Sequence, residues 1–257
     1  MSDTPVLKTV NLGINFGGLK AVDDFNIEIM QGELVGLIGP NGAGKTTVFN
    51  LLTGVYAPTE GDIFISGKRV NGLKPHQFVA EGIARTFQNI RLFKQMSVID
   101  NVKIACDQSI KYKLGGGLLH SKLYWDEEQR VHEKALELLK LFNLDTKADF
   151  VASNLPYGQQ RKLEIARALA TDMKILLLDE PAAGMNPVET AELLDSINMI
   201  RDKFGIAILL IEHDMSLVMN VCERITVIDY GRTIARGLPS EVSNNPDVIA
   251  AYLGTDD

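Results

Sequence analysis

Two short stretches have residue types and spacing suited to phosphate chemistry, and the first is GPNGAGKT at 39–46. It fits the pattern G-x-x-x-x-G-K-[ST], follows the apolar run ELVGLI and precedes a helical pattern. Its glycines allow successive backbone N–H groups to surround phosphate oxygens, and the helix N-terminus adds partial positive charge. Lys45 is expected to reach the β- and γ-phosphates, and the Thr46 hydroxyl to ligate Mg²⁺. The alternative is a glycine-rich turn that holds no ligand.

The second stretch is ILLLDEP at 175–181, four apolar residues followed by two carboxylates. A buried strand that ends in Asp-Glu places charge where open α/β sheets bind ligands. Asp179 is expected to hold Mg²⁺, and Glu180 to orient or deprotonate an attacking water. Taken alone, such a strand end is often a helix cap or a surface pair. The sequence has no N-K-x-D element for guanine, so ATP is the expected nucleotide.

Three single residues carry weaker signals, and a short NPVE stretch has a clear structural interpretation. Gln88 follows a short strand-like stretch, and taken singly it would be a surface residue. His213 ends a buried strand, where a lone histidine is usually structural, and Phe16 would by default be a core residue. Asn186 in NPVE is predicted to be the N-cap of a helix, with Glu189 completing a capping box.

The stretch LPYGQQRKLEIARALA at 155–170 has an unusual helix start. Apolar residues recur at helical spacing, but Pro156 and Tyr157 precede Gly158 where a serine or aspartate cap would be usual. The stretch is either a plain packing helix or half of a phosphate site whose other half lies elsewhere.

The composition is that of a folded, acidic protein. Of the 257 residues, 46% are hydrophobic and 23% charged, and the formal net charge is −7 with a pI near 5.2. This balance argues against nucleic acid as a partner. Cys106 and Cys222 lie far apart, which indicates a reducing compartment and neither a disulfide framework nor a zinc site. The N-terminus does not resemble a signal peptide, and the apolar runs are too short to cross a bilayer.

Strand and helix patterns alternate on both sides of a helical segment. Residues 6–38 and DIFISG predict strands, with a helix over 45–52, and residues 98–142 predict helices joined by a hinge at Gly115–Gly117. From residue 174 onward, apolar strands alternate with helices. The fold class is therefore α/β, a mostly parallel buried sheet with an antiparallel β layer and an inserted helical part.

The order and spacing of these motifs resemble the ATP-binding cassette, the ATPase subunit of ABC transporters and a P-loop NTPase fold, over essentially the whole chain. The resemblance implies a single ABC ATPase domain over 1–257, with the core and antiparallel β layer over 1–88 and 171–257. A helical subdomain would occupy about 89–170. The implied Walker A residues are Gly39, Pro40, Asn41, Gly42, Ala43, Gly44, Lys45, Thr46 and Thr47.

The same resemblance implies roles for the remaining candidate residues. Phe16 would stack on adenine, Gln88 would be the Q-loop residue that also contacts the metal, and Asp179 would be the Walker B aspartate. Glu180 would be the catalytic glutamate and His213 the switch histidine. Tyr157, Gly158 and Gln159 would belong to the signature that caps the ATP of a second cassette.

Within this family the chain is most similar to ATP-binding subunits of branched-chain amino acid transporters (the LivG-like type). The similarity lies in GIARTFQNIRLFKQMSVIDNV, YGQQRKLEIARAL, LDEPAAGMNP, IEHDMSLVM and NNPDVIAAYLG. It departs from the general family pattern at Pro156 for the signature serine, Tyr157 for its first glycine and Asn186 for the D-loop aspartate. Of these, Pro156 removes a hydroxyl and a backbone N–H that could meet the partner's γ-phosphate.

The implied partners are a second cassette (a homodimer or a paired ATPase subunit), two transmembrane permease subunits and, indirectly, a periplasmic or extracellular substrate-binding protein. The chain would be cytoplasmic and peripheral on the inner face of the cell membrane. The alternatives are a related urea, amide or lipopolysaccharide transporter, a soluble ABC ATPase acting on DNA or the ribosome, and a non-hydrolysing regulatory module. The presence of one cassette without sustained heptads argues against a soluble ABC ATPase acting on DNA or the ribosome. A non-hydrolysing module is disfavoured because the expected functional residues are intact, namely Lys45, Asp179, Glu180 and His213.

Overall fold

The computed structural model describes residues 4–109 and 122–253, which divide into two compact units. Unit 1 comprises 1–88, 174–183 and 197–257, and unit 2 comprises 89–173 and 184–196. The predicted glycine hinge at 115–117 lies outside the described residues. Unit 2 extends past the helical range expected from sequence, because residues 184–196 belong to it as well.

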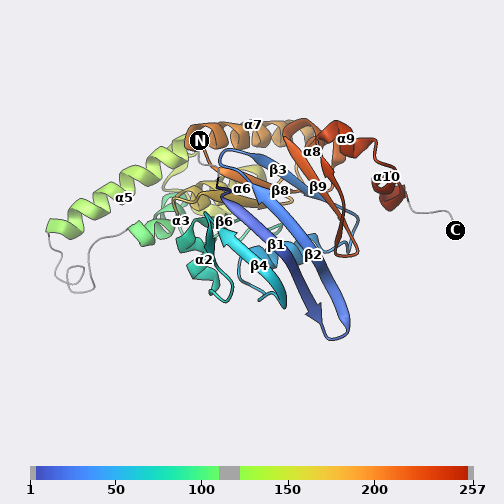
Figure 1. Ribbon diagram of the computed structural model, residues 1–257. Helices are drawn as coiled ribbons and strands as arrows, with labels where there is room; N and C mark the ends of the chain where they lie inside the picture. Colours follow the sequence, from blue (N-terminus) through green and yellow to red (C-terminus); the bar gives the residue numbers. More distant parts are fainter. Residues whose placement is uncertain (1–3, 110–121, 254–257) are drawn as a thin grey trace. The chain divides into compact units, whose positions relative to one another are not determined.

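Unit 1 is built on two sheets (Figure 1). The four-stranded antiparallel sheet has the order β2-β1-β4-β5, with bounds Leu19–Ile29, Leu7–Phe16, Glu60–Ile65 and Lys68–Arg69. The six-stranded sheet has the order β10-β9-β3-β8-β7-β6, with bounds Arg232–Gly237, Arg224–Asp229, Leu34–Ile38, Ala207–Ile211, Ile175–Asp179 and Ile83–Arg85. All neighbours in the second sheet are parallel except β9 and β10.

The central strands of the six-stranded sheet are fully buried, which explains their continuous apolar sequences. Every residue of β3, β7 and β8 is buried. Helix α1 (Lys45–Leu52) shares one core with residues of both sheets, to which it contributes Val48, Phe49, Leu51 and Leu52. The predicted helix over 45–52 is confirmed at both ends.

Parallel pairing brings the ends of four strands to the same edge of the sheet. Strand β3 ends just before Gly39, β6 three residues before Gln88, β7 just before Glu180 and β8 two residues before His213. The chemistry-bearing residues of unit 1 are therefore gathered at the carboxyl edge, where open α/β sheets hold their ligands.

The remaining helices were only partly foreseen. Those of unit 1 are α2 (Pro75–Glu81), α8 (Met215–Val221), α9 (Pro239–Ser243) and α10 (Pro246–Leu253). Those of unit 2 are α3 (Val98–Lys103), α5 (Lys122–Lys140) and α6 (Tyr157–Leu169), with the 3-10 segments η1 (Ile104–Ser109), η2 (Asp145–Lys147) and η3 (Ala152–Asn154). Helix α7 (Pro187–Phe204) contributes residues to both units. Within residues 4–109 and 122–253, no helix is long and apolar enough to span a membrane.

Candidate active site

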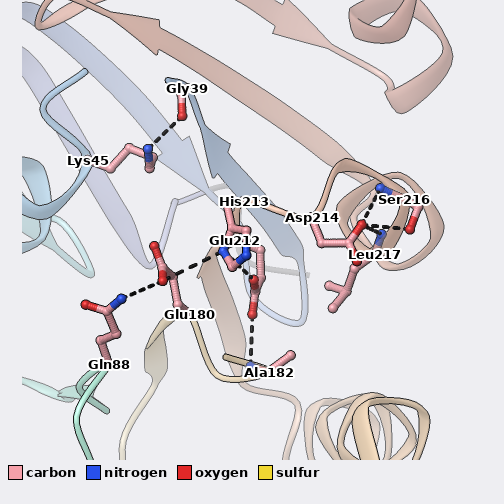
Figure 2. Close-up of polar contacts among 10 residues, drawn as sticks. All are labelled: Gly39, Lys45, Gln88, Glu180, Ala182, Glu212, His213, Asp214, Ser216 and Leu217. Atoms are coloured by element: carbon pink, nitrogen blue, oxygen red, sulfur yellow. Dashed lines mark hydrogen bonds and ion pairs between the residues drawn. The ribbon is translucent and has the colours of Figure 1, made fainter. Parts of the chain in front are cut away.

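The loop between β3 and α1 is held in shape by glycines and by its own lysine. A Cβ at Gly39 would lie 2.0 Å from the carbonyl oxygen of Ile228 in the neighbouring strand, so only glycine fits there. Gly44 has φ 104°, a left-handed conformation that favours glycine, and it precedes the first helical residue. The Lys45 ammonium donates to the carbonyl oxygen of Gly39 at 2.6 Å (Figure 2). It also donates to the carbonyl oxygen of Pro40 at 2.9 Å.

Lys45 is buried, and its electrostatic surroundings reflect the acidic strand end. Burial lowers the pKa of its ammonium, and the negative charges of Glu180 and Asp179 oppose that effect. The predicted loop cation thus lies within the electrostatic reach of both predicted carboxylates. The Thr46 side chain that follows belongs to an exposed residue in the first turn of α1.

Glu180 is where three predicted residues meet. The Gln88 side-chain amide donates to Glu180 Oε2 at 2.7 Å, and His213 Nδ1 lies 3.7 Å from the same oxygen (Figure 2). Gln88 is exposed and the His213 side chain is 63% exposed, so both can be reached from solvent. The structure therefore brings Gln88, Glu180 and His213 together.

The backbone at Glu180 is strained, as is common at functional sites. Its φ is 44°, unusual for a residue with a side chain, and its N–H donates to the Ile211 carbonyl at 2.9 Å. That hydrogen bond to the end of β8 fixes the direction in which the chain leaves β7. The residue with this unusual backbone conformation is the one that carries the carboxylate.

Glu212 is a buried carboxylate beside this group that the sequence did not single out. It accepts the Ala182 N–H at 2.9 Å, and it lies 3.7 Å from His213 Nδ1. Burial raises the pKa of the Glu212 carboxyl, while the Ala182 amide opposes the shift. It supports the loop after Glu180 and one side of the histidine.

Asp179 is also buried, and it has a partner that the sequence did not predict. Arg85 Nη2 donates to Asp179 Oδ2 at 2.6 Å, and Arg85 Nη1 donates to Asn50 Oδ1 at 2.7 Å. The sequence signal was slight, a single cation in the strand-like stretch GIARTFQ. Because a buried arginine needs compensation, that cation could have been matched to an acidic strand end.

Phe16 differs from its default expectation as a core residue. Its side chain is 44% exposed, and its ring lies edge-on to Tyr56 with 5.2 Å between centroids. It ends β1 next to the turn into β2. An exposed ring at a strand end is available for stacking on a planar ligand.

In unit 2, the start of α6 is as unusual as its sequence. Pro156 is the N-cap and has no side-chain group to offer the first turn, and Tyr157 is 44% exposed. Gln159 Oε1 accepts a hydrogen bond from Lys147 at 2.7 Å. The apolar positions Leu163, Ala166, Leu169 and Ala170 are buried, so packing accounts for one face of this helix.

Two further local predictions in unit 2 can be compared with the structure. Asn186 Oδ1 accepts the N–H groups of Val188 and Glu189 at 3.0 Å each, and Glu189 Oε2 accepts the Asn186 N–H at 3.1 Å. The predicted capping box is confirmed. Arg161, interleaved with the apolar residues of α6, is fully buried and pairs with Glu164 at 2.9 Å, which an amphipathic pattern does not indicate.

A parallel sheet with a glycine-lysine loop after one strand and an Asp-Glu pair after another defines the P-loop class of nucleotide hydrolases. A family model described as ABC transporter matches residues 22–183, and one described as branched-chain amino acid ATP-binding cassette transporter matches residues 232–257. The chain belongs to the ABC transporter family as an ATP-binding ATPase subunit, and the predicted family and fold class are confirmed.

Similar proteins of known name cover nearly all of the chain. The high-affinity branched-chain amino acid transport ATP-binding protein LivG of Escherichia coli (strain K12) is 48% identical over 250 residues, 97% of this chain and 98% of that protein. BraF of Pseudomonas aeruginosa, of the same description, is 45% identical over 250 residues, again 97% and 98%. The crystal structure of the ADP conformation of MJ1267, an ATP-binding cassette of an ABC transporter, superposes with a TM-score of 0.84 at 32% identity, covering 98% of this chain and 99% of that one.

Proposed function

We propose that this chain binds and hydrolyses ATP to power uptake of branched-chain amino acids through partner membrane subunits. Its near-complete overlap with relatives named for that transport supports the proposal, as does the matching C-terminal segment 232–257. The observation that carries the hydrolytic part is the meeting of Gln88 and His213 on one oxygen of Glu180.

Glu180 acts as the general base that orients and deprotonates the attacking water. Its carboxylate lies at the carboxyl edge of the sheet and is partly exposed, within reach of a ligand on the loop after β3. His213, which follows the end of β8, contacts the γ-phosphate. Gln88 contacts the metal and the attacking water, and so connects them to the loop after β6. General-base catalysis of this kind contributes about 10²–10⁴-fold to rate.

The predicted metal donors suit magnesium. Thr46, Gln88 and Asp179 offer hydroxyl, amide and carboxylate oxygens, the hard ligands that Mg²⁺ prefers. Bound Mg²⁺ would neutralise charge on the β- and γ-phosphates as it builds up during transfer. Lys45, whose ammonium lies against its own loop, would supply a further positive charge.

The nucleotide is held by the loop and by an aromatic ring. The backbone N–H groups of 39–47 surround the phosphates, with the N-terminus of α1 adding its dipole. Phe16, exposed at the end of β1, stacks on adenine. These residues position ATP so that its γ-phosphate reaches Glu180.

A second cassette completes the site. The N-terminus of α6, with Tyr157, Gly158 and Gln159, caps the ATP held by the partner cassette, and the partner's α6 caps this chain's ATP. A ligand shifts a conformational equilibrium only by its difference in affinity for the two states, and ATP binds the closed pair better. Hydrolysis removes the bridging γ-phosphate and the pair reopens.

The opening and closing of the pair drives two transmembrane permease subunits. The chain itself is peripheral on the cytoplasmic face of the cell membrane, and a substrate-binding protein outside the membrane delivers the amino acid. These partners bind and carry the transported amino acid, which never contacts this chain.

The proposal is tested in the assembled transporter. We expect phosphate release from ATP to require Mg²⁺ and to rise when the binding protein delivers leucine, isoleucine or valine in a reconstituted vesicle. Matched vesicles containing urea or a non-branched amino acid serve as controls. Hydrolysis with no response to any branched-chain amino acid would contradict the substrate class, and the absence of Mg²⁺-dependent hydrolysis would contradict the enzymatic role.

A further inference from the structure

Arg85 is the buried cation nearest to the predicted metal ligand, and nothing in the function described so far requires it. It is the last residue of β6, three residues before Gln88, and its side chain is only 6% exposed. A buried charge is costly unless it is paired and hydrogen-bonded. Its contacts therefore indicate what it does.

The Arg85 guanidinium joins two elements of the site. One nitrogen donates to Asp179 at the end of β7, and another donates to Asn50 in α1, the helix that begins at the phosphate loop. The plane is also flanked by aromatic rings, with Cζ 4.8 Å from the centroid of Phe87 and 5.4 Å from that of Phe49. A forked, planar cation is needed for this combination of contacts, and lysine could not reproduce it.

Stability alone does not explain an arginine at this position. Replacing a buried ion pair by apolar residues of similar volume is often neutral or stabilising. In addition, Arg85 Nε is buried and makes no hydrogen bond within residues 4–109 and 122–253. The distinguishing interaction of the Arg85 side chain is therefore its ion pair with Asp179.

We propose that Arg85 is a positioning residue that serves as the built-in counter-ion of Asp179 and weakens Mg²⁺ binding there. It occupies Oδ2, and among the described residues no hydrogen bond reaches Oδ1, which leaves that oxygen for the metal shell. The carboxylate is thus compensated and oriented before metal arrives, and the fixed positive charge repels the arriving cation. This inference rests on the proposed role of Asp179 in holding Mg²⁺.

Charge and geometry can be separated with two substitutions. Arg85→Met removes the charge and keeps an apolar stem between the rings, whereas Arg85→Lys keeps the charge and loses the fork. The readout is the Mg²⁺ concentration that gives half-maximal binding of a fluorescent ATP analogue to the full chain, with binding in EDTA as the metal-free reference. Phe87→Leu, which removes one ring contact and no charge, is the matched control.

We expect the half-saturating Mg²⁺ concentration to fall at least threefold in Arg85→Met, because the Asp179 carboxylate attracts the metal more strongly without its counter-ion. It should stay within twofold of wild type in Arg85→Lys and in Phe87→Leu. An unchanged or higher value in Arg85→Met would overturn the proposal, as would an equal fall in Arg85→Lys.

If Arg85→Met does not fold, Arg85→Gln provides the same test, since its amide donates a hydrogen bond without charge. A shift of more than twofold in Arg85→Lys overturns the proposal by itself. Failure of the proposed function gives a different result, because wild-type protein would then show no Mg²⁺ dependence of analogue binding at all.

Discussion

The starts of helices α1 and α6 can be compared, because the sequence offers both as candidate phosphate sites. Both lack a side-chain cap, since Gly44 precedes one and Pro156 the other. At α1 the glycine loop is closed by Lys45, which is buried and hydrogen-bonded to its own loop. At α6 the first residue, Tyr157, is exposed, and its neighbour Gln159 is engaged by Lys147.

The difference shows which of the two starts gathers charged side chains around it within one chain. The α1 start has its lysine, its carboxylates and its histidine in the same unit, gathered at one sheet edge by parallel pairing. The α6 start offers backbone N–H groups and a dipole, with no side-chain cap of its own. Under the proposed function, the charged side chains that complete this second site come from the partner cassette whose ATP it caps.

The largest expected effect is a difference in ATP hydrolysis between substitutions of Lys45, beside the start of α1, and of Lys147, beside the start of α6. Lys45→Ala should lower kcat/KM for ATP at least 100-fold, about 2.7 kcal/mol of transition-state stabilisation, because it removes the loop's cation. Lys147→Ala is the matched control, and it should leave ATP binding by the single chain unchanged. Steady-state hydrolysis and analogue binding measure both effects, and equal losses in the two variants would remove the distinction.

The next effect tests the backbone fit of the α1 loop. Gly39→Ala would place a methyl group 2.0 Å from the Ile228 carbonyl oxygen, so the strand or loop must move. We expect a loss of about 2–3 kcal/mol in the free energy of unfolding. Gly42→Ala is the control, since among the described residues, its two chain neighbours apart, no atom lies within 4 Å of its added Cβ, and its φ of 83° opposes the change. Denaturant titrations should give a lower free energy of unfolding for Gly39→Ala than for Gly42→Ala.

At α6 the same type of substitution should affect function rather than stability. A Cβ at Gly158 would lie 3.4 Å from Glu189 Oε1, which is an ordinary contact. The free energy of unfolding of Gly158→Ala should therefore be within about 1 kcal/mol of the wild-type value. Under the proposed function, its methyl group would lie against the nucleotide of the partner cassette. We expect a roughly tenfold fall in ATPase activity of the assembled transporter, about 1.4 kcal/mol. Unchanged activity would argue that α6 is a packing helix only.

The smallest effect concerns the missing cap. Pro156→Ser restores a hydroxyl and an N–H at the N-cap of α6, and caps are worth about 1 kcal/mol. We expect a rise of about threefold in ATPase activity of the assembled transporter, with ATP binding by the single chain unchanged. A rise in single-chain binding would show that the substitution acts within the chain and not across the pair.

The α1 site was largely predictable because its parts are local in sequence. Strand β3 is a five-residue apolar run followed directly by the glycine-lysine loop. Strand β7 has four apolar residues and ends in Asp179, the first carboxylate of its motif, so strand and motif are specified together. The meeting of Gln88, Glu180 and His213 could be expected once the strands were taken as parallel. Strand β10 was not foreseen, and the C-terminal helices α9 and α10 could be given no bounds, because these short and partly exposed sequences carry little periodicity.

Pairings between distant residues could not be predicted. Arg85 and Asp179 are 94 positions apart, and Asp179 meets Arg85 because β6 and β7 are neighbours in the sheet. Likewise, the burial of Arg161 in α6 depends on Glu164 and on packing in unit 2, and helical spacing alone would place it on a polar face. The position of Phe16 at an exposed strand end also depends on the turn that follows.

The most direct test of the account is the replacement Glu180→Gln, which keeps the shape of the side chain and removes the base. We predict that the variant binds Mg²⁺ and ATP, accumulates as a two-cassette species in analytical ultracentrifugation, and releases phosphate at least 100-fold more slowly than wild type, about 2.7 kcal/mol. Phosphate release at the wild-type rate would contradict the central claim that Glu180 is the catalytic base.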